Sequence, residues 1–381
     1  MRVLVWQWGR RGGGPRYAVE LVSGLAQRTG VEAMLSLSAQ SEILGGAGAP
    51  VCQLPVRTYE DLAGLVVRLP ALPFQVAPLA ARVRALRPDV AICAMPAALD
   101  LLMAAALRRV GVPYYVVVHD ADPHPGDGIP LQMTLQRALM RRAHGLVALT
   151  EHVAERLAQQ SLVRGRPLFI VPHPPRIFGP TPPPPRAHGG KLRLLSFGRL
   201  LPYKGLDLLA EALRVLGPRA DMEIRVVGNG PESSVLEALR RLPGVTVENR
   251  WVPEAEVGTI IAWADALVLS HREASQSGGA AAAIAAGRWV VATRVGGITE
   301  QLRDQPLARL CDPTAESLAR ELFLLAEQPP PLAGPIDDPR GAWRAATAEL
   351  ARELSSNLGC PLPPADQPGL AKRPKEVTST S

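Results

Sequence analysis

The chain has 381 residues, 47% of them hydrophobic and 20% charged, which is enough to bury the cores of two globular domains. Its formal net charge of +7 indicates anionic partners, but 4% aromatic residues argue against a nucleic-acid binder that stacks on bases. There is no run of eighteen apolar residues, and the start MRVLVWQWGRR is typical of a first strand, so we expect neither a membrane span nor a signal peptide.

The first half of the chain alternates short apolar runs with helical patterns. This alternation predicts a parallel sheet with helices on both faces. The expected strands lie at residues 3–6, 90–94, 114–118, 146–149 and 168–171, with helices from about residue 15 and at 101–110, 131–142 and 151–159. We therefore place an N-terminal Rossmann-like domain at residues 1–173 and a proline-rich linker at 174–190.

The second half repeats this pattern. Strands are expected at residues 192–196, 223–227, 245–248, 266–269 and 290–292, with helices after Lys204, Glu232, Pro253, Gly278 and Thr299. They predict a second Rossmann-like domain at 191–328. A proline-rich break and a late helix at 329–360 are expected to pack back across the cleft, and the tail at 361–381 to be disordered. The fold class is thus α/β, with two doubly wound parallel-sheet domains facing across a cleft.

One apolar stretch of the first half, residues 62–74, is interrupted by Pro70 and Pro73. We expect ordinary core packing for it, with a shallow membrane contact as the alternative. The arginines of this half make it basic, which favours an anionic membrane surface as a partner.

The sequence FGRLLPYKG at residues 197–205 carries two cations at a strand–loop–helix junction. Arg199 and Lys204 would lie beside a helix N-terminus, where unpaired N–H groups and the macrodipole favour phosphate. The chain has only four lysines, and Lys204 is the one that lies clear of the tail and of the linker, whose end Lys191 adjoins. A diphosphate site therefore competes with a solvated lysine at a helix start.

In the first half, two loops stand at expected strand ends. GRRGGG at 9–14 matches neither the dinucleotide fingerprint nor a P-loop, but it lets the backbone approach a substrate closely. His119 ends an expected strand, with Asp120, Asp122, His124 and Asp127 close behind it. Such a density of titratable groups favours a functional site over a structural histidine. Their spacing fits no zinc template, and the four cysteines (Cys52, Cys93, Cys311 and Cys360) have neither metal nor redox spacing, which is typical of reduced cytoplasmic thiols.

In the second half, Gly228 and Asn229 follow a strand and form either a tight turn or a loop over a nucleotide. The stretch HREASQSGG places Glu273 at a strand exit, and Ser277 and Gly278 offer N–H groups at the next helix start.

Together these segments resemble the family 4 glycosyltransferases of the GT-B class over nearly the whole chain. The motifs that carry the resemblance are GRLLPYKGLDLL at 198–209, VVGNGPE at 226–232, ADALVLS at 264–270, EASQSG at 273–278, ATRVGGITE at 292–300 and VVVHD at 116–120. Each motif is modest alone, but their order is specific.

The resemblance implies that residues 1–173 form the acceptor-side domain and residues 191–328 the nucleotide-sugar-binding domain. It also implies a role for each candidate residue. Arg199 and Lys204 would bind the donor diphosphate, Glu273 the donor sugar, and the Ser277 and Gly278 backbone the phosphate. His119 would lie near the anomeric carbon, and the loop with Gly13 and Gly14 near the donor phosphate and the acceptor. One position departs from the family, since Ala282 stands where a second glutamate usually holds the ribose. That loss should weaken nucleotide binding by about 1.5–3 kcal/mol.

We therefore expect a retaining glycosyltransferase that uses a UDP- or GDP-sugar and needs neither cofactor nor metal, because its cations stabilise the leaving diphosphate. We expect it in the cytoplasm, with its basic N-terminal half in contact with the inner face of the membrane and a lipid-linked or polysaccharide acceptor. The alternatives are a catalytically impaired binding or regulatory protein, which Ala282 favours, and another GT-B enzyme such as an epimerase or a phosphorylase. Nucleic acid is not expected as a partner.

Overall fold

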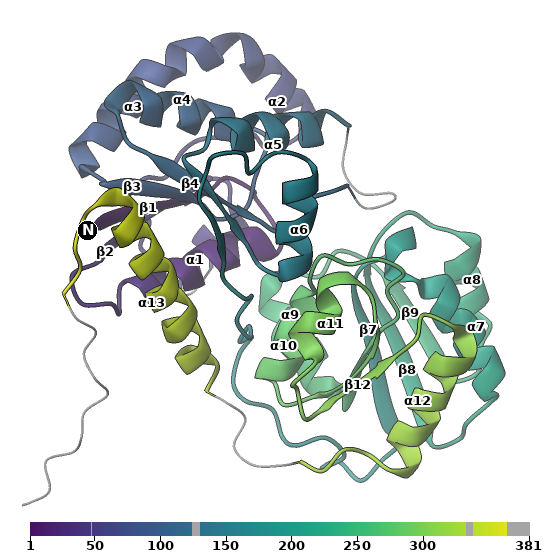
Figure 1. The fold of residues 1–381 in the computed structure, drawn as a ribbon. Coiled ribbons are helices and arrows are strands. Elements are labelled where there is room, and N and C mark those ends of the chain that lie inside the picture. Colours follow the sequence, from purple (N-terminus) through teal and green to yellow (C-terminus); the bar gives the residue numbers. More distant parts are fainter. Residues whose placement is uncertain (47, 124–129, 333–337, 364–381) are drawn as a thin grey trace, which may run out of the picture.

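The computed structural model describes residues 1–46, 48–123, 130–332 and 338–363. Two α/β domains lie side by side, each built on a six-stranded parallel sheet, as the alternating pattern predicts (Figure 1). The strand order is β2-β1-β3-β4-β5-β6 in the first sheet and β12-β11-β10-β7-β8-β9 in the second.

The N-terminal domain contains every strand expected from the sequence and one more, β2. Its strands are β1 (Arg2–Gln7), β2 (Glu32–Leu37), β3 (Val90–Cys93), β4 (Tyr114–Val118), β5 (Gly145–Ala148) and β6 (Leu168–Ile170). Its helices are α1 (Gly13–Leu25), α2 (Leu62–Arg68), α3 (Leu72–Leu86), α4 (Asp100–Val110), α5 (Pro130–Arg142) and α6 (Glu151–Gln159). The strands are buried apolar runs, as in a parallel sheet covered on both faces.

The C-terminal domain follows the same plan. Its strands are β7 (Leu192–Arg199), β8 (Met222–Asn229), β9 (Val245–Asn249), β10 (Ala266–Leu269), β11 (Trp289–Thr293) and β12 (Ala308–Cys311). Its helices are α7 (Leu206–Leu216), α8 (Ser234–Arg240), α9 (Glu254–Trp263), α10 (Gly278–Ala285), α11 (Gly296–Leu302) and α12 (Ala315–Glu327). The helix expected after Thr299 begins earlier, at Gly296, where a φ of 45° starts the turn.

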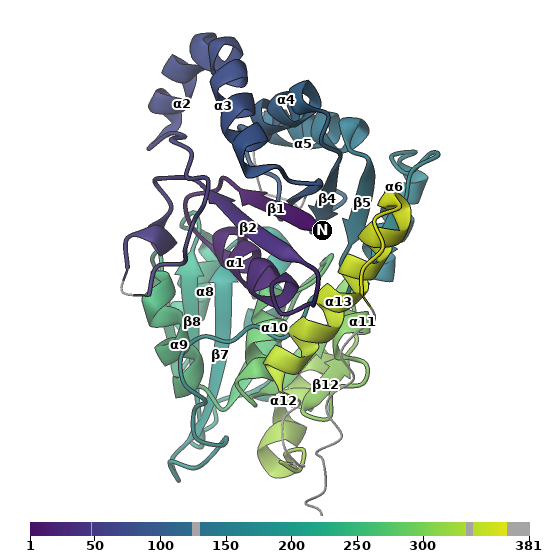
Figure 2. The same cartoon turned by 90° about the vertical axis from the view of Figure 1, so that its left-hand side faces the viewer.

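The last helix, α13 (Pro339–Leu358), lies on the N-terminal domain against α1 (Figure 2). Trp343 and Leu354 are buried in the core shared with β1 and α1, and the indole N–H of Trp343 donates to the Pro175 carbonyl at 3.0 Å. The chain thus returns to its first domain after completing the second. Most of the tail, from residue 364 on, lies outside the described residues.

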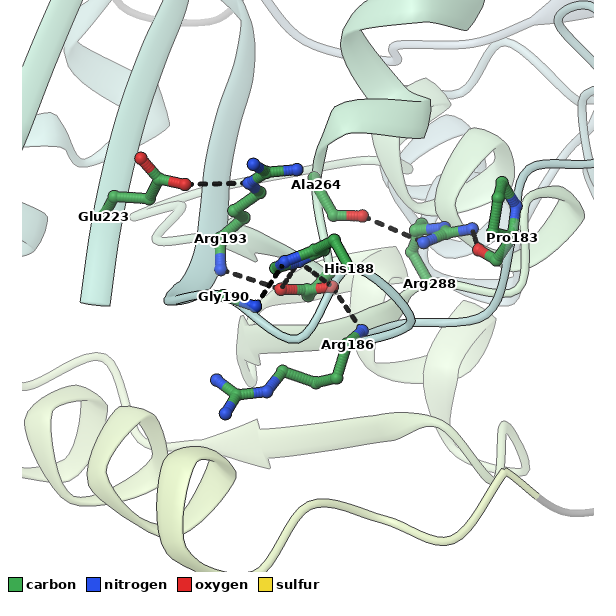
Figure 3. A network of polar contacts seen from close by, with 9 residues as sticks. Pro183, Arg186, His188, Gly190, Arg193, Glu223, Ala264 and Arg288 are labelled. Atoms are coloured by element: carbon green, nitrogen blue, oxygen red, sulfur yellow. Dashed lines mark hydrogen bonds and ion pairs between the residues drawn. The ribbon is translucent and has the colours of Figure 1, made fainter. Parts of the chain in front are cut away.

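The end of the linker is fastened to the C-terminal sheet by one buried carboxylate. Asp265, just before β10, accepts the backbone N–H groups of Arg186 at 2.5 Å and Arg193 at 2.9 Å, and lies 3.0 Å from the His188 ring (Figure 3). Arg193 in turn donates to Glu223 at 2.8 Å. These bonds lie at the amino-terminal ends of β7 and β10, so the opposite end of the sheet is left to form the site.

Much of the apolar stretch at 62–74 is exposed. Leu65 and Leu72 pack against the core of the N-terminal domain, so the expected core packing is confirmed only in part. Val66, Val67, Leu69 and Phe74 are 63%, 78%, 49% and 81% exposed. The helical stretch Ala63–Leu86 is long and apolar enough to cross a membrane by length and composition, although Arg68 interrupts the apolar run in the sequence. It bends at Leu69–Ala71 between α2 and α3, so that it is two helices and not one straight rod (Figure 2).

Candidate active site

A cavity of about 780 Å³ lies between the two domains. Its walls come from loops that follow the carboxyl ends of strands in both sheets, where open α/β sheets bind their ligands. In the C-terminal domain these loops include those after β7 and β10, the neighbouring strands at which the strand order reverses. In the N-terminal domain the reversal lies between β1 and β3, beside the glycine-rich loop.

The two predicted cations line this cavity. Arg199 is the last residue of β7, and the parallel register places it opposite Asn229 of β8. Lys204 ends a short 3-10 turn, and its ammonium donates to Nε2 of His271 at 2.9 Å. Both charges lie 5.5 Å from the ring centroid of the buried Tyr203, so this ring holds them on one wall.

Glycines keep the backbone of this wall within reach of a ligand. A Cβ on Gly228 would lie 1.6 Å from the Gly198 carbonyl oxygen, so no side chain fits there. A Cβ on Gly13 would lie 2.6 Å from Nη1 of Arg176 on the opposite side of the cavity. Gly14 and Asn229 line the cavity as well.

The first turn of α10 can offer backbone N–H groups to a ligand, but the N–H of Ser277 is already engaged. The Ser277 hydroxyl accepts the Ala280 N–H at 3.2 Å, and the Ser277 N–H donates to the Gln301 side chain at 3.0 Å. Gly278 and its neighbour Gly279 line the cavity at the first turn. These two residues are therefore better placed than Ser277 to offer N–H groups to an anion.

Two further positions concern predicted carboxylate contacts: Ala282 in α10, which has no carboxylate, and Glu273 in the loop before α10, which has one. Ala282 lines the cavity and is 3% exposed, so a glutamate at this position would face the ligand. Glu273 is exposed and is not among the described residues that line the cavity. Its predicted contact with the donor sugar stays a prediction.

His119 directly follows β4 on the opposite wall and is 4% exposed. Its Nε2 lies 3.0 Å from the Ala94 carbonyl, so Nε2 carries the proton and Nδ1 is an acceptor. Burial lowers the pKa of His119 to about 4, which keeps the ring neutral. Tyr17 packs edge-on against it, with ring centroids 4.9 Å apart.

The sequence did not point to several residues of this wall and its surroundings. His173 and Arg176 are buried and line the cavity, although the prolines at 174 and 175 made this segment resemble a linker. Trp251 and Glu254 line it from the start of α9. An arginine a few residues past the carboxyl end of β6 was the one signal that could have been followed.

The acidic loop after His119 does not form a metal centre in the described part of the chain. Asp122 is engaged by Arg156 at 2.7 Å and by Gln160 at 2.6 Å. No group of three or more His, Cys, Asp or Glu side chains able to hold a metal occurs among the described residues. His124 and Asp127 lie outside them.

Two family models cover most of the chain. Residues 191–328 match "Glycosyl transferases group 1", and residues 12–174 match "Glycosyl transferase 4-like domain". With its two facing Rossmann-like domains, the chain belongs to the group 1 glycosyltransferases with the GT-B fold, as the motifs predicted.

A curated relative, the 2-deoxystreptamine glucosyltransferase of Streptomyces kanamyceticus, is 28% identical over 250 residues. The match covers 60% of this chain and 65% of the relative, so just under two thirds of that protein is spanned. Among solved structures, sucrose-phosphate synthase from Thermosynechococcus elongatus has a TM-score of 0.67 at 14% identity and covers 94% of this chain and 100% of its own. Anabaena HepE in complex with UDP and glucose has a TM-score of 0.66 at 16% identity and covers 93% of this chain and 99% of its own. At these identities the structures show a shared fold.

Proposed function

We propose that this protein transfers a sugar from a UDP-sugar to an acceptor hydroxyl, with retention of the anomeric configuration and without a metal ion. The observation that carries the proposal is the pair of cations, Arg199 and Lys204, held around Tyr203 at the mouth of β7 and facing the cavity. Retention is taken from the resemblance to family 4. UDP is favoured over GDP because HepE, which shares the fold, was solved with UDP and with UDP-glucose.

In this mechanism the cations stabilise the charge that develops on the leaving diphosphate. The first N–H groups of α10 would add to that stabilisation, since helix N-termini favour phosphate. The neutral His119 would accept a hydrogen bond from a sugar hydroxyl through Nδ1 and orient the anomeric carbon. Closure of the two domains would exclude water and limit hydrolysis of the donor.

The test is a thermal-shift and hydrolysis screen of the purified protein with UDP, GDP, ADP and their sugar conjugates. We expect stabilisation by UDP compounds, loss of that shift in Arg199→Ala/Lys204→Ala, and slow release of UDP from the matching UDP-sugar. Binding without turnover in any acceptor screen would favour the second candidate, a binding protein, which Ala282 supports by removing a carboxylate from the cavity. No shift with any nucleotide would refute both.

We also propose that the enzyme works at the inner face of the cytoplasmic membrane on a lipid-linked or polysaccharide acceptor. The support is the apolar pair of consecutive helices α2 and α3, in which an apolar window of 18 residues within 63–86 is only 11% buried. Residues 62–88 contain no Asp or Glu, and four arginines, at 68, 82, 84 and 87. Apolar side chains flanked by cations and free of acids suit the surface of an anionic bilayer.

Sedimentation with vesicles tests this contact. We expect the protein to pellet with phosphatidylglycerol-containing vesicles and less with pure phosphatidylcholine, because its arginines attract anionic headgroups. Val67→Glu/Phe74→Glu should release it, whereas Val215→Glu, at an exposed valine of α7 in the other domain, should not. Equal pelleting of all three proteins would contradict the proposal.

A further inference from the structure

One arginine of the cavity is buried without a carboxylate partner. Arg176 is 6% exposed, and its backbone N–H donates to the Ala281 carbonyl at 2.9 Å, which ties it to α10. Its Nε makes no hydrogen bond, and no ion pair joins its guanidinium to a carboxylate among the described residues. Because burying an unpaired cation costs free energy, such a side chain calls for an anion from outside the chain.

The nearby acids have other partners, although Oε2 of Glu20 makes no hydrogen bond. Arg16 lies between Glu20 at 2.8 Å and Glu254 at 3.2 Å, and so holds both carboxylates. Glu42 accepts the N–H at the N-cap of α1 at 3.2 Å. Glu20 and Glu254 therefore attract Arg176 through space without forming a hydrogen bond to it.

A neutral histidine orients the guanidinium. Nδ1 of His173 lies 2.8 Å from the Pro174 carbonyl, so Nδ1 carries the proton and Nε2 is an acceptor. Nη2 of Arg176 lies 3.4 Å from that Nε2. Burial lowers the pKa of His173 well below its usual range, so this acceptor stays uncharged.

The other end of the guanidinium, Nη1, lies between two helix N-termini. It is 2.6 Å from the position of a Cβ on Gly13, at the start of α1, and 3.8 Å from that of a Cβ on Gly278, at the start of α10. The N-cap of α1 is Gly12, which has no side chain to cap the helix. A guanidinium and two N-termini that converge on one end of a cavity form a site for an oxyanion.

We propose that Arg176 binds an oxyanion of the donor at its sugar end and thereby positions the anomeric carbon beside His119. This inference rests on the proposed function. The oxyanion is either the β-phosphate of the diphosphate or a carboxylate on an acidic donor sugar. Arg176 is thus a donor-binding residue additional to Arg199 and Lys204, which lie on the other wall.

The test compares Arg176→Met with the wild-type protein by calorimetric titration with UMP, UDP, UDP-glucose and UDP-glucuronic acid, together with melting temperatures. A ligand-binding role predicts about a tenfold or greater loss of affinity, since charge-assisted hydrogen bonds are strong. It also predicts an unchanged or higher melting temperature, because the unpaired buried charge is gone. Arg176→Lys, which keeps the charge, should retain part of the affinity.

The ligands separate the two sources of the oxyanion. If it is the β-phosphate, the variant loses affinity for UDP and UDP-glucose and keeps that for UMP. If it is a carboxylate, the variant binds UDP normally and loses only a wild-type preference for UDP-glucuronic acid over UDP-glucose.

The control is Arg288→Lys. Arg288 is equally buried, but it donates to the carbonyls of Ala264 and Ala286 at 3.0 Å and lies away from the cavity. The Arg288→Lys variant should have a lower melting temperature than the wild-type protein and the same affinities for the ligands. If Arg176→Met behaves like this control, Arg176 is structural and the inference is overturned. If the wild-type protein binds none of the four ligands, the proposed function fails together with it.

Discussion

The two walls of the cleft differ in burial and in charge. On the N-terminal wall, Tyr17, His119 and His173 are buried and packed against one another, and burial keeps both histidines neutral by lowering their pKa values. On the C-terminal wall, Arg199 is exposed and Lys204 half-buried. Apart from Arg176, the N-terminal wall is thus buried and neutral (the dry wall), which suits orientation of a sugar. The C-terminal wall is more exposed and cationic (the wet wall), which suits binding of phosphate. One fold used twice therefore supplies two different surfaces.

The largest expected effect comes from removing the charge of the wet wall. Arg199→Ala/Lys204→Ala should lower kcat/KM by about 100- to 1000-fold, the usual result of losing a group that stabilises a developing anion. Steady-state assays with the donor identified by the screen measure this. The control is Arg219→Ala, at a half-buried arginine away from the cavity that is paired with Asp221 and Glu327. A loss below tenfold would mean that the wet wall is not where the diphosphate binds.

A smaller effect is expected on the dry wall. His119→Asn should lower kcat by roughly tenfold to 100-fold, because an oriented acceptor is displaced. Since the pKa of His119 is about 4, its loss should leave the pH profile between pH 6 and 8 unchanged. A profile that changes shape in this range would show that His119 takes up or releases a proton during turnover.

A substitution at Ala282, the position that departs from the family pattern, should raise the affinity for the donor. Ala282→Glu should tighten binding of the UDP-sugar by about tenfold, because a carboxylate hydrogen bond to the ribose is restored in the cavity. Titration calorimetry measures the affinity, and Ala282→Val controls for added volume. Equal affinity in the glutamate and valine variants would mean that the ribose lies elsewhere.

The smallest effect concerns stability in the dry domain. Asp100, at the start of α4, accepts from the Trp6 indole at 3.1 Å and the Ala97 N–H at 2.6 Å, yet burial raises its pKa to about 7. A carboxyl whose pKa is raised by folding stabilises fully below its unfolded pKa, near 3.8, and this contribution is lost as the pH rises through about 7. Asp100→Asn should therefore melt with less pH dependence between pH 5 and 8.

Melting temperatures of both proteins across this range provide the measurement. Parallel curves for the variant and the wild type would show that Asp100 keeps a nearly normal pKa in the folded protein.

Local pattern was enough to predict most elements of both sheets and the cations at the end of β7. Runs such as residues 114–118 are apolar and β-branched, and Gly and Pro mark the turns, so the order of elements could be followed along the chain. It was not enough for α2 and α3, because an apolar stretch has the same composition whether a core or solvent covers it. Exposure at Val67 and Phe74 depends on what other segments leave uncovered.

The sequence by itself determined the fold class, the family and the placement of Arg199, Lys204 and His119 at strand ends, because these depend on spacing along the chain. Only the tertiary structure decided that Arg176, in a segment resembling a linker, ends between the starts of α1 and α10. Likewise, the tertiary structure brought the Tyr203 ring against both cations and engaged the Ser277 N–H in a hydrogen bond to the Gln301 side chain. The reason is physical. Burial, hydrogen-bond partners and electrostatic surroundings are set by residues distant in sequence, which the local pattern does not encode.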